Sequence, residues 1–244
     1  MSPRDRLRPG CEDGPAAHVG GGRRILKRFA QGELRLARIE AFSDGVFAIV
    51  VTLLVLELKV PPLHDHGSVS ELGHQLRDLL PKFLSWIISF VIVCKFWLNH
   101  HHLLGLARHA DYGMVWLNAL FLMSQSFVPF PTAILGEYPG NPLAVSMFGL
   151  VMAASTLLFV GLHAYILRNL GKPDVVEAQD PHIIRKSFVG PASYLLGAAA
   201  AWFSVHAGFV VYLLTPLFFI VPPASPRAAR SGAAVDARPD EKRS

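Results

Sequence analysis

The stretch RIEAFSDGVFAIVVTLLVLELKVP, from Arg38 to Pro61, decides the fold of this 244-residue chain. It opens with charged and hydroxyl side chains and then runs apolar from Val46 to Leu56, interrupted only by Thr52. At a rise of ~1.5 Å per residue, a helix from Ala41 to Leu58 is nearly long enough to cross a hydrocarbon core of ~30 Å. The pattern therefore predicts a membrane-spanning helix with a polar head.

The polar and the aliphatic side chains of this helix are expected on different sides. At ~100° per residue, one stripe holds Ile49, Thr52, Leu53 and Leu56. Glu40 and Asp44 lie four residues apart on roughly the opposite side, and Ser43 lies beyond one edge of that side. An acid in a spanning segment is costly, so Asp44 needs a partner or a function. Spacing alone also allows ordinary packing for the stripe and interhelical hydrogen bonding for the polar cluster.

The composition is that of an integral membrane protein. Hydrophobic residues make up 52% of the chain and charged residues only 17%, and the apolar residues come in long blocks. The net charge is +5, but the basic residues lie outside those blocks and show no nucleic-acid motif. Cys11 and Cys94 fall in a tail and a span, so no disulfide is expected.

No motif of catalysis or cofactor binding is present in the sequence. The chain lacks Gly-x-Ser-x-Gly, His-Glu-x-x-His and a nucleotide-binding loop, so we expect neither an enzyme nor a cofactor. Residues 59 to 80 are expected to form a polar loop that contains His64, His66 and His74. These histidines lack a fixed spacing of four residues on a helix, so the sequence predicts no metal site.

The fold class predicted is an all-α integral membrane protein with six transmembrane helices. After the first span, the expected spans are Pro81–Leu104, Tyr112–Phe130, Pro142–Leu167, Phe188–His206 and Phe209–Val221. Ala207-Gly208 is expected to form the turn between the last two. The six-helix membrane domain would occupy residues 36–222, between disordered tails at 1–35 and 223–244.

Lysine and arginine counts orient the bundle. With six spans, 19 of the 23 basic residues fall on the side of the termini, whereas only Lys59, Arg77 and Lys82 fall on the other side. Lys95 lies inside the second span. The positive-inside rule therefore predicts that both termini are cytoplasmic. The high content of Ala, Arg and Gly is typical of a bacterial protein, for which the cell membrane is the expected location.

This topology brings several polar residues to the cytoplasmic end. The first span leaves the cytoplasm and the second returns to it, so Asp44 lies at the level of Asn99–His102, and the third span adds Asn118. An ionised carboxylate there needs hydrogen-bond donors or a cation. We expect one network of Ser43, Asp44, Asn118 and either Lys95 or a histidine, without a preference among the histidines.

The run Arg38…Phe42-Ser43-Asp44-Gly45, followed by Ala48-Ile49 and Thr52, closely resembles the signature of the transmembrane protein 175 family. Members of this family are potassium-permeable channels. The resemblance extends over roughly Arg38 to Pro222 and implies a homotetramer, because this chain carries one six-helix repeat. It also implies hydrophobic constrictions at Ile49, Leu53 and Leu56, with Thr52 offering hydroxyls to potassium ions.

The resemblance further implies a signature network around the Phe-Ser-Asp segment, which pairs with His, Trp and Asn residues of neighbouring helices. Its candidate members here are Arg38, Phe42, Ser43, Asp44, Lys95, Trp97, His100, His101 and Asn118. The three consecutive histidines depart from the expected His-His-Arg-type ending, so the local cation is missing or is Lys95.

Three functions compete at this point. The first is a potassium-selective leak channel in the lipid bilayer, without a voltage sensor, since no span is rich in arginine. The second is a proton leak or a proton-coupled transporter that uses Asp44, Lys95 and the histidines of the second span. The third is a non-conducting membrane scaffold.

Overall fold

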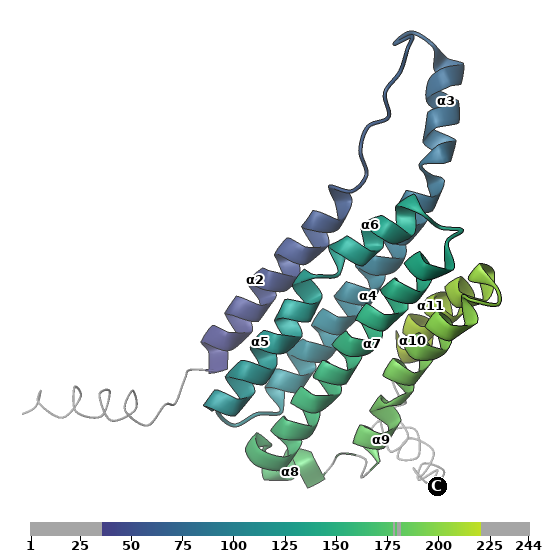
Figure 1. Ribbon diagram of the computed structural model, residues 1–244. Coiled ribbons are helices and arrows are strands. Elements are labelled where there is room, and N and C mark those ends of the chain that lie inside the picture. Colours follow the sequence, from purple (N-terminus) through teal and green to yellow (C-terminus); the bar gives the residue numbers. More distant parts are fainter. Residues whose placement is uncertain (1–35, 178, 180–181, 221–244) are drawn as a thin grey trace, which may run out of the picture.

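A computed structural model describes residues 36–177, 179 and 182–220, and these residues are almost entirely helical (Figure 1). The helices are α2 (Leu36–Val55), α3 (Val69–Asp78), α4 (Leu80–Gly105), α5 (Tyr112–Ser126), α6 (Pro129–Glu137), α7 (Pro142–Tyr165), the π-helix η1 (Ile166–Leu170), α8 (Pro173–Glu177), α9 (Ile183–Ser187), α10 (Val189–Ala200) and α11 (Val205–Ile220). The tails predicted to be disordered, together with Cys11, lie outside the described residues.

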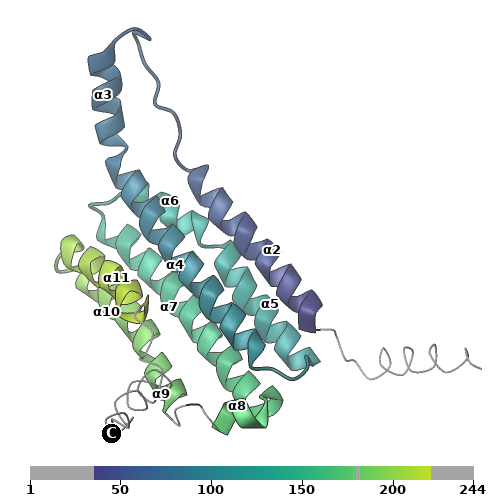
Figure 2. The ribbon, with the colours of Figure 1, turned by 180° about the vertical axis from the view of Figure 1, so that it is seen from behind.

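The long helices run side by side as one bundle (Figures 1 and 2). Helix α2 lies at one edge, where it packs against α4 and α5. The hairpin of α10 and α11 lies at the other edge and packs against α7, with α11 also touching α4. Helix α2 therefore has one side covered by the bundle and one side open.

Within the described ranges, three helical segments are long and apolar enough to cross a membrane: Leu80–Gly105, Tyr112–Glu137 and Pro142–Leu170. Helix α2 has 20 residues but carries Arg38, Glu40 and Asp44 in its first half. Helices α10 and α11 are shorter, with 12 and 16 residues. The all-helical membrane architecture is confirmed, whereas the count of six spans and the cytoplasmic termini stay predictions.

The third predicted span is longer than expected. It does not stop at Phe130 but continues through α6 to Glu137. Pro129 and Pro131 separate α5 from α6, yet they lie in the first turn of α6, where the missing N–H groups leave no helical hydrogen bond unmade. The prolines therefore break the helix without ending the span.

The segment 59–80 is not simply a loop, because it contains α3. The Ser68 hydroxyl caps this helix by accepting a hydrogen bond from the Glu71 N–H. The Glu71 carboxylate accepts hydrogen bonds from the backbone N–H groups of His64 (2.8 Å) and Asp65 (3.1 Å), which hold its pKa below the usual value. In the part of the chain that the structure describes, no cluster of three His, Cys, Asp or Glu side chains could hold a metal ion.

The turn between the last two helices also lies elsewhere than predicted. Helix α10 ends at Ala200 and α11 begins at Val205, so Ala207 and Gly208 lie inside α11. A Cβ atom at Gly208 would come within 3.1 Å of the Gly197 carbonyl oxygen. Gly208 therefore serves the close approach of two helices rather than a turn.

The contact of this hairpin with α7 depends on glycine. A Cβ atom at Gly149 would lie 2.0 Å from the Tyr212 hydroxyl and 2.9 Å from the Tyr194 carbonyl oxygen. The Tyr212 hydroxyl is itself held by a hydrogen bond that it donates to the Val145 carbonyl (2.9 Å). This hydrogen bond holds α11 close to α7, so the hairpin has little room to move away from an added side chain at Gly149.

We predict that Gly149→Ala lowers the free energy of unfolding by ~1–3 kcal/mol, since the added methyl group overpacks this contact. The matched control is Gly161→Ala in the same helix, where a Cβ atom meets nothing within 4 Å. That control is expected to leave stability unchanged or to raise it by up to ~1 kcal/mol through helix propensity. Thermal unfolding in detergent measures both, and equal melting temperatures would contradict the packing.

Candidate functional site

The covered side of α2 follows a regular spacing. Ser43, Phe47, Val50 and Leu54 are buried against the bundle. They recur at intervals of three or four residues, as one face of a helix requires. This face begins with a hydroxyl and continues with apolar side chains, so the polar contact lies near the start of the helix.

The predicted aliphatic stripe lies on the open side. Ile49, Leu53 and Leu56 are 59%, 41% and 66% exposed in the isolated chain. Thr52 is exposed beside them, and its hydroxyl donates a hydrogen bond to the Ile49 carbonyl (2.8 Å). Leu56 follows the end of the helix, in a turn where its N–H bonds to the Leu53 carbonyl (3.1 Å). Most of the stripe therefore points away from its own bundle, and Leu53 lies at its edge.

A buried hydrogen-bonded chain joins α2, α4 and α5. The Asn118 amide nitrogen donates to the Ser43 hydroxyl oxygen (3.0 Å), and the Asn118 amide oxygen lies 2.7 Å from Nε2 of His100. Since that oxygen can only accept, the His100 Nε2–H is the donor. The Ser43 hydroxyl in turn donates to the Ile39 carbonyl (2.8 Å). The network thus includes a histidine, and that histidine is His100.

Aromatic rings hold His100 in this position. Its ring stacks on Phe121 at a centroid distance of 5.6 Å and lies at the same distance from Phe47. His101 and His102, the next two residues, are exposed. Only the first of the three histidines therefore takes part in the buried chain.

Asp44 forms a hydrogen bond with Trp97. Its carboxylate accepts a hydrogen bond from Nε1 of Trp97 (2.9 Å), and the Trp97 ring stacks on His101 at a centroid distance of 6.3 Å. Arg38 and Phe42 are exposed on α2, and Lys95 is half-buried on α4. The pairing of Lys95 with Asp44 stays a prediction.

Comparisons with known proteins agree with this arrangement. A family model described as the endosomal/lysosomal potassium channel TMEM175 matches residues 38–129. A potassium channel from Chamaesiphon minutus is 36% identical over 189 residues, which make up 75% of this chain and 92% of that protein. The chain belongs to the TMEM175 family. A Streptomyces collinus potassium channel is a further relative of this TMEM175 protein, 34% identical over 189 residues, or 75% of this chain and 90% of its own.

A solved relative supports the fold of this TMEM175 family member. The crystal structure of a lysosomal potassium-selective channel TMEM175 homolog from Chamaesiphon minutus aligns with a TM-score of 0.65 at 37% identity. The alignment covers 76% of this chain and 96% of that one. The human endosomal/lysosomal proton channel TMEM175 is 41% identical, but only over 90 residues, which are 35% of this chain and 18% of the human protein.

Two contacts in this TMEM175 chain were not foreseen from the sequence. The Tyr165 hydroxyl donates to the Asp111 carboxylate (2.7 Å), and the Ser89 and Thr132 hydroxyls lie 2.7 Å apart. Asp111 directly precedes α5 and caps it, which is a position that the sequence does signal. The partners of Asp111, Ser89 and Thr132 depend on helix packing and carry no sequence signal.

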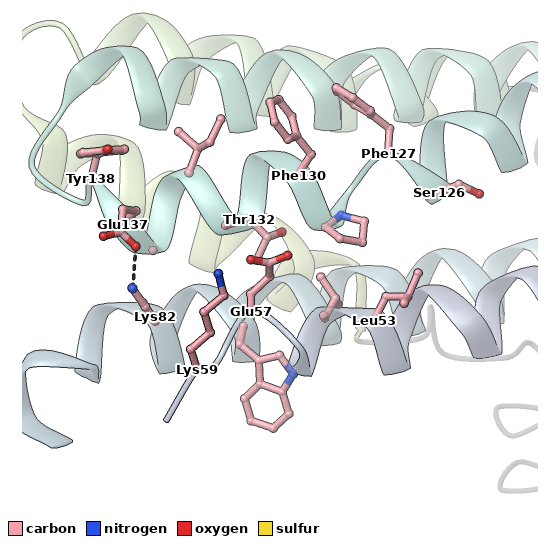
Figure 3. A pocket seen from close by; sticks show the side chains of 16 residues that line it. Leu53, Glu57, Lys59, Lys82, Ser126, Phe127, Phe130, Thr132, Glu137 and Tyr138 are labelled. Carbon is pink, nitrogen blue, oxygen red and sulfur yellow. Dashed lines mark ion pairs between the residues drawn. The ribbon is translucent and has the colours of Figure 1, made fainter. Parts of the chain in front are cut away.

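A cavity of about 530 Å³ opens at the other end of the bundle, between the end of α2, the start of α4 and α6 (Figure 3). Four charged residues line it: Glu57, Lys59, Lys82 and Glu137. Lys82 Nζ and Glu137 Oε2 form an ion pair at 2.5 Å. In the sequence, Lys59 and Lys82 indicate only the orientation of the bundle, and no pattern signals this cavity.

We predict that Ser43→Ala destabilises the protein by ~1–3 kcal/mol, because the buried Asn118 amide loses its acceptor. Ser193→Ala is the control, since the Ser193 hydroxyl also bonds to the carbonyl four residues before it but is exposed. The control is expected to change stability by less than ~0.5 kcal/mol. Thermal unfolding in detergent distinguishes the two, and an equal loss in both variants would show that the interhelical bond contributes nothing.

Proposed function

We propose that this chain forms a potassium-selective leak channel of the cell membrane, as a homotetramer with the α2 helices around a central pore. The observation that carries the proposal is the division of α2 into a buried face and an open aliphatic face. The choice of potassium as the conducted ion is supported by relatives that are named potassium channels. They are 34–36% identical to this chain and are matched over 90–92% of their length. Residues 36–222 would form the channel domain, in a protein that conducts ions rather than catalyses a reaction.

The open face of α2 supplies the parts that such a pore needs. Rings of Ile49, Leu53 and Leu56 would form hydrophobic constrictions, which close a pore by excluding water. Thr52 lies among them, and its hydroxyl hydrogen is already donated to the Ile49 carbonyl. The oxygen lone pairs of Thr52 therefore remain available to a passing cation.

The polar network would act as the support of this helix. Asn118 of α5 donates to Ser43 and accepts from His100 of α4, and Trp97 of α4 donates to Asp44. The contact of Ser43 lies on the side of α2 that faces the bundle, and the contact of Asp44 lies next to that side. Both are away from the aliphatic stripe. In the proposed channel the network fixes the pore helix and does not contact the ion.

Proton conduction is the second candidate. The family member in human is named a proton channel, and it is 41% identical over the 90 residues that match. A relay would use Asp44, Lys95 and the histidines of α4. The hydrogen bond of Asp44 to Trp97 gives one such group a fixed position.

We predict that Thr52→Val changes the selectivity of the channel in liposomes. Loss of the hydroxyl oxygens is expected to lower the ratio of potassium to sodium permeability by about fivefold, the equivalent of roughly one hydrogen bond. The control is Thr156→Val in α7, whose hydroxyl also bonds to its own helix (2.6 Å to the Met152 carbonyl). The reversal potential in opposed potassium and sodium gradients is the measurement.

Other outcomes of the same recordings separate the candidates. A current that follows the pH gradient and stops with Asp44→Asn or Lys95→Ala would establish proton conduction instead. Silence of the wild-type protein under all conditions would favour a scaffold. Because Asp44→Asn can prevent assembly, the oligomeric mass of each variant is measured first.

We further predict that Ile49→Ser raises the resting conductance, since a hydroxyl wets a constriction that an isoleucine ring keeps dry. Leu98→Ser is the control, because Leu98 is comparably exposed (47%) but lies on α4. Single-channel recordings compare the two. An increase that is equal in both variants would remove Ile49 from the pore.

A further inference from the structure

The cavity at the end of the bundle holds one ion pair and two charges without a partner. Lys82 is neutralised by Glu137. Neither Glu57, which is half-buried, nor Lys59, which is exposed, forms an ion pair or a side-chain hydrogen bond with another residue in the described ranges. Figure 3 shows both side chains in the space between the helices. Glu57 and Lys59 therefore offer one negative and one positive charge to a ligand that carries both charges.

Membrane-spanning segments end where hydrocarbon meets water, and these charges lie near the ends of such segments. Lys82 lies at the start of the span Leu80–Gly105, and Glu137 is the last residue of the span Tyr112–Glu137. Glu57 and Lys59 follow the end of α2. The exposed Tyr138 ring lies at the same level, where amphipathic aromatic residues are common in membrane proteins.

The walls below the charges are apolar. Leu53, Phe127, Phe130, Ala133 and Ile134 line the cavity between the end of α2 and α6. The volume of about 530 Å³ is in the range of small-molecule sites. A ligand that fits this cavity has a zwitterionic head at the water boundary and an apolar chain that points into the membrane.

We propose that this cavity binds a phospholipid with an ethanolamine headgroup. The headgroup phosphate contacts the Lys59 ammonium group, and the primary ammonium group of the headgroup donates hydrogen bonds to the Glu57 carboxylate. An acyl chain lies along Phe127, Phe130 and Ala133. A glycerol headgroup has a phosphate but no cation, so it leaves Glu57 unpaired beside a negative charge.

Native mass spectrometry of the full-length protein in detergent tests the proposal independently of any current. Phosphatidylethanolamine and phosphatidylglycerol with identical acyl chains are titrated onto the delipidated protein. We expect the ethanolamine lipid to bind about threefold more tightly, as the gain of one partly exposed ion pair implies. Glu57→Gln is expected to abolish this preference, whereas Lys59→Gln weakens the binding of both lipids.

Four controls complete the experiment. Asp78→Asn and Arg77→Gln change charges on α3, outside the cavity lining, and are expected to leave binding unchanged. Ala133→Phe fills the apolar wall and is expected to weaken both lipids equally. Glycerophosphoethanolamine, which has the headgroup without acyl chains, is expected not to displace the bound lipid.

The proposal is overturned if the wild-type protein binds both lipids equally, or if Glu57→Gln keeps the preference. It is also overturned if Ala133→Phe binds as much lipid as the wild type, which is the result expected when a neighbouring copy fills the cavity. Displacement of the lipid by glycerophosphoethanolamine would also overturn the proposal, because the ligand would then be a soluble headgroup compound and not a phospholipid. The melting temperature of each variant confirms its folding, and the charge variants decide the matter if Ala133→Phe does not fold.

Discussion

A polar side chain within a membrane has to find its hydrogen-bond partner inside the protein, and this constraint sets the orientation of α2. Asn118 meets it by using both ends of its amide, with the nitrogen on Ser43 and the oxygen on His100. The three residues come from α2, α5 and α4, so one buried side chain ties three helices together. Substitution of any one of the three residues leaves a buried donor or acceptor without a hydrogen bond. The three side chains therefore depend on one another.

The position of Ser43 determines what the rest of α2 presents. Once Ser43 faces the bundle, Phe47, Val50 and Leu54 follow it on the same side. A rotation of the helix by ~100°, one residue, would instead bury Asp44 and expose Ser43. Such a rotation would take a carboxylate away from Trp97 and into an apolar interior, at a cost of several kcal/mol. The open side of α2 is therefore fixed by polar contacts near its start.

The sequence indicates which residues come near one another, but not how they pair, since Asp44 accepts its hydrogen bond from Trp97 and not from Asn118. Antiparallel spans place Ser43, Asn118 and the histidines at one end, and topology is sufficient for that. The choice of His100 over His101 and His102 was not predictable, since consecutive side chains point ~100° apart and only packing against Phe121 selects one.

Other differences between expectation and structure come from residues with two uses. Pro129 can end a helix or begin one, and here it begins α6 inside a continuing span. Gly208 can make a turn or admit a neighbouring helix, and its closeness to Gly197 shows the second use. Ser68-x-x-Glu71 is a capping signal that indicates the start of α3, although the surrounding segment is polar and reads as a loop. A charge such as Lys59 indicates topology in the sequence, whereas only the structure shows that Glu57 and Lys59 line one cavity.

Exposure alone does not distinguish a helix face that meets other copies from one that meets lipid, because both are apolar. The exposed residues of α4 are large and include Leu84, Ile87 and Leu98. The open side of α2 differs, since it also carries Gly45 and Ala48, three residues apart.

These two small residues lie together roughly 60° around the helix from the stripe of Ile49, Thr52, Leu53 and Leu56. Small residues allow the backbones of two helices to approach closely, a property that contact with lipid tails does not require. In a ring of helices, the surfaces that touch the neighbours flank the surface that faces the axis. The two small residues beside Ile49, Leu53 and Leu56 have this relation, which favours contact with other copies of α2 over contact with lipid.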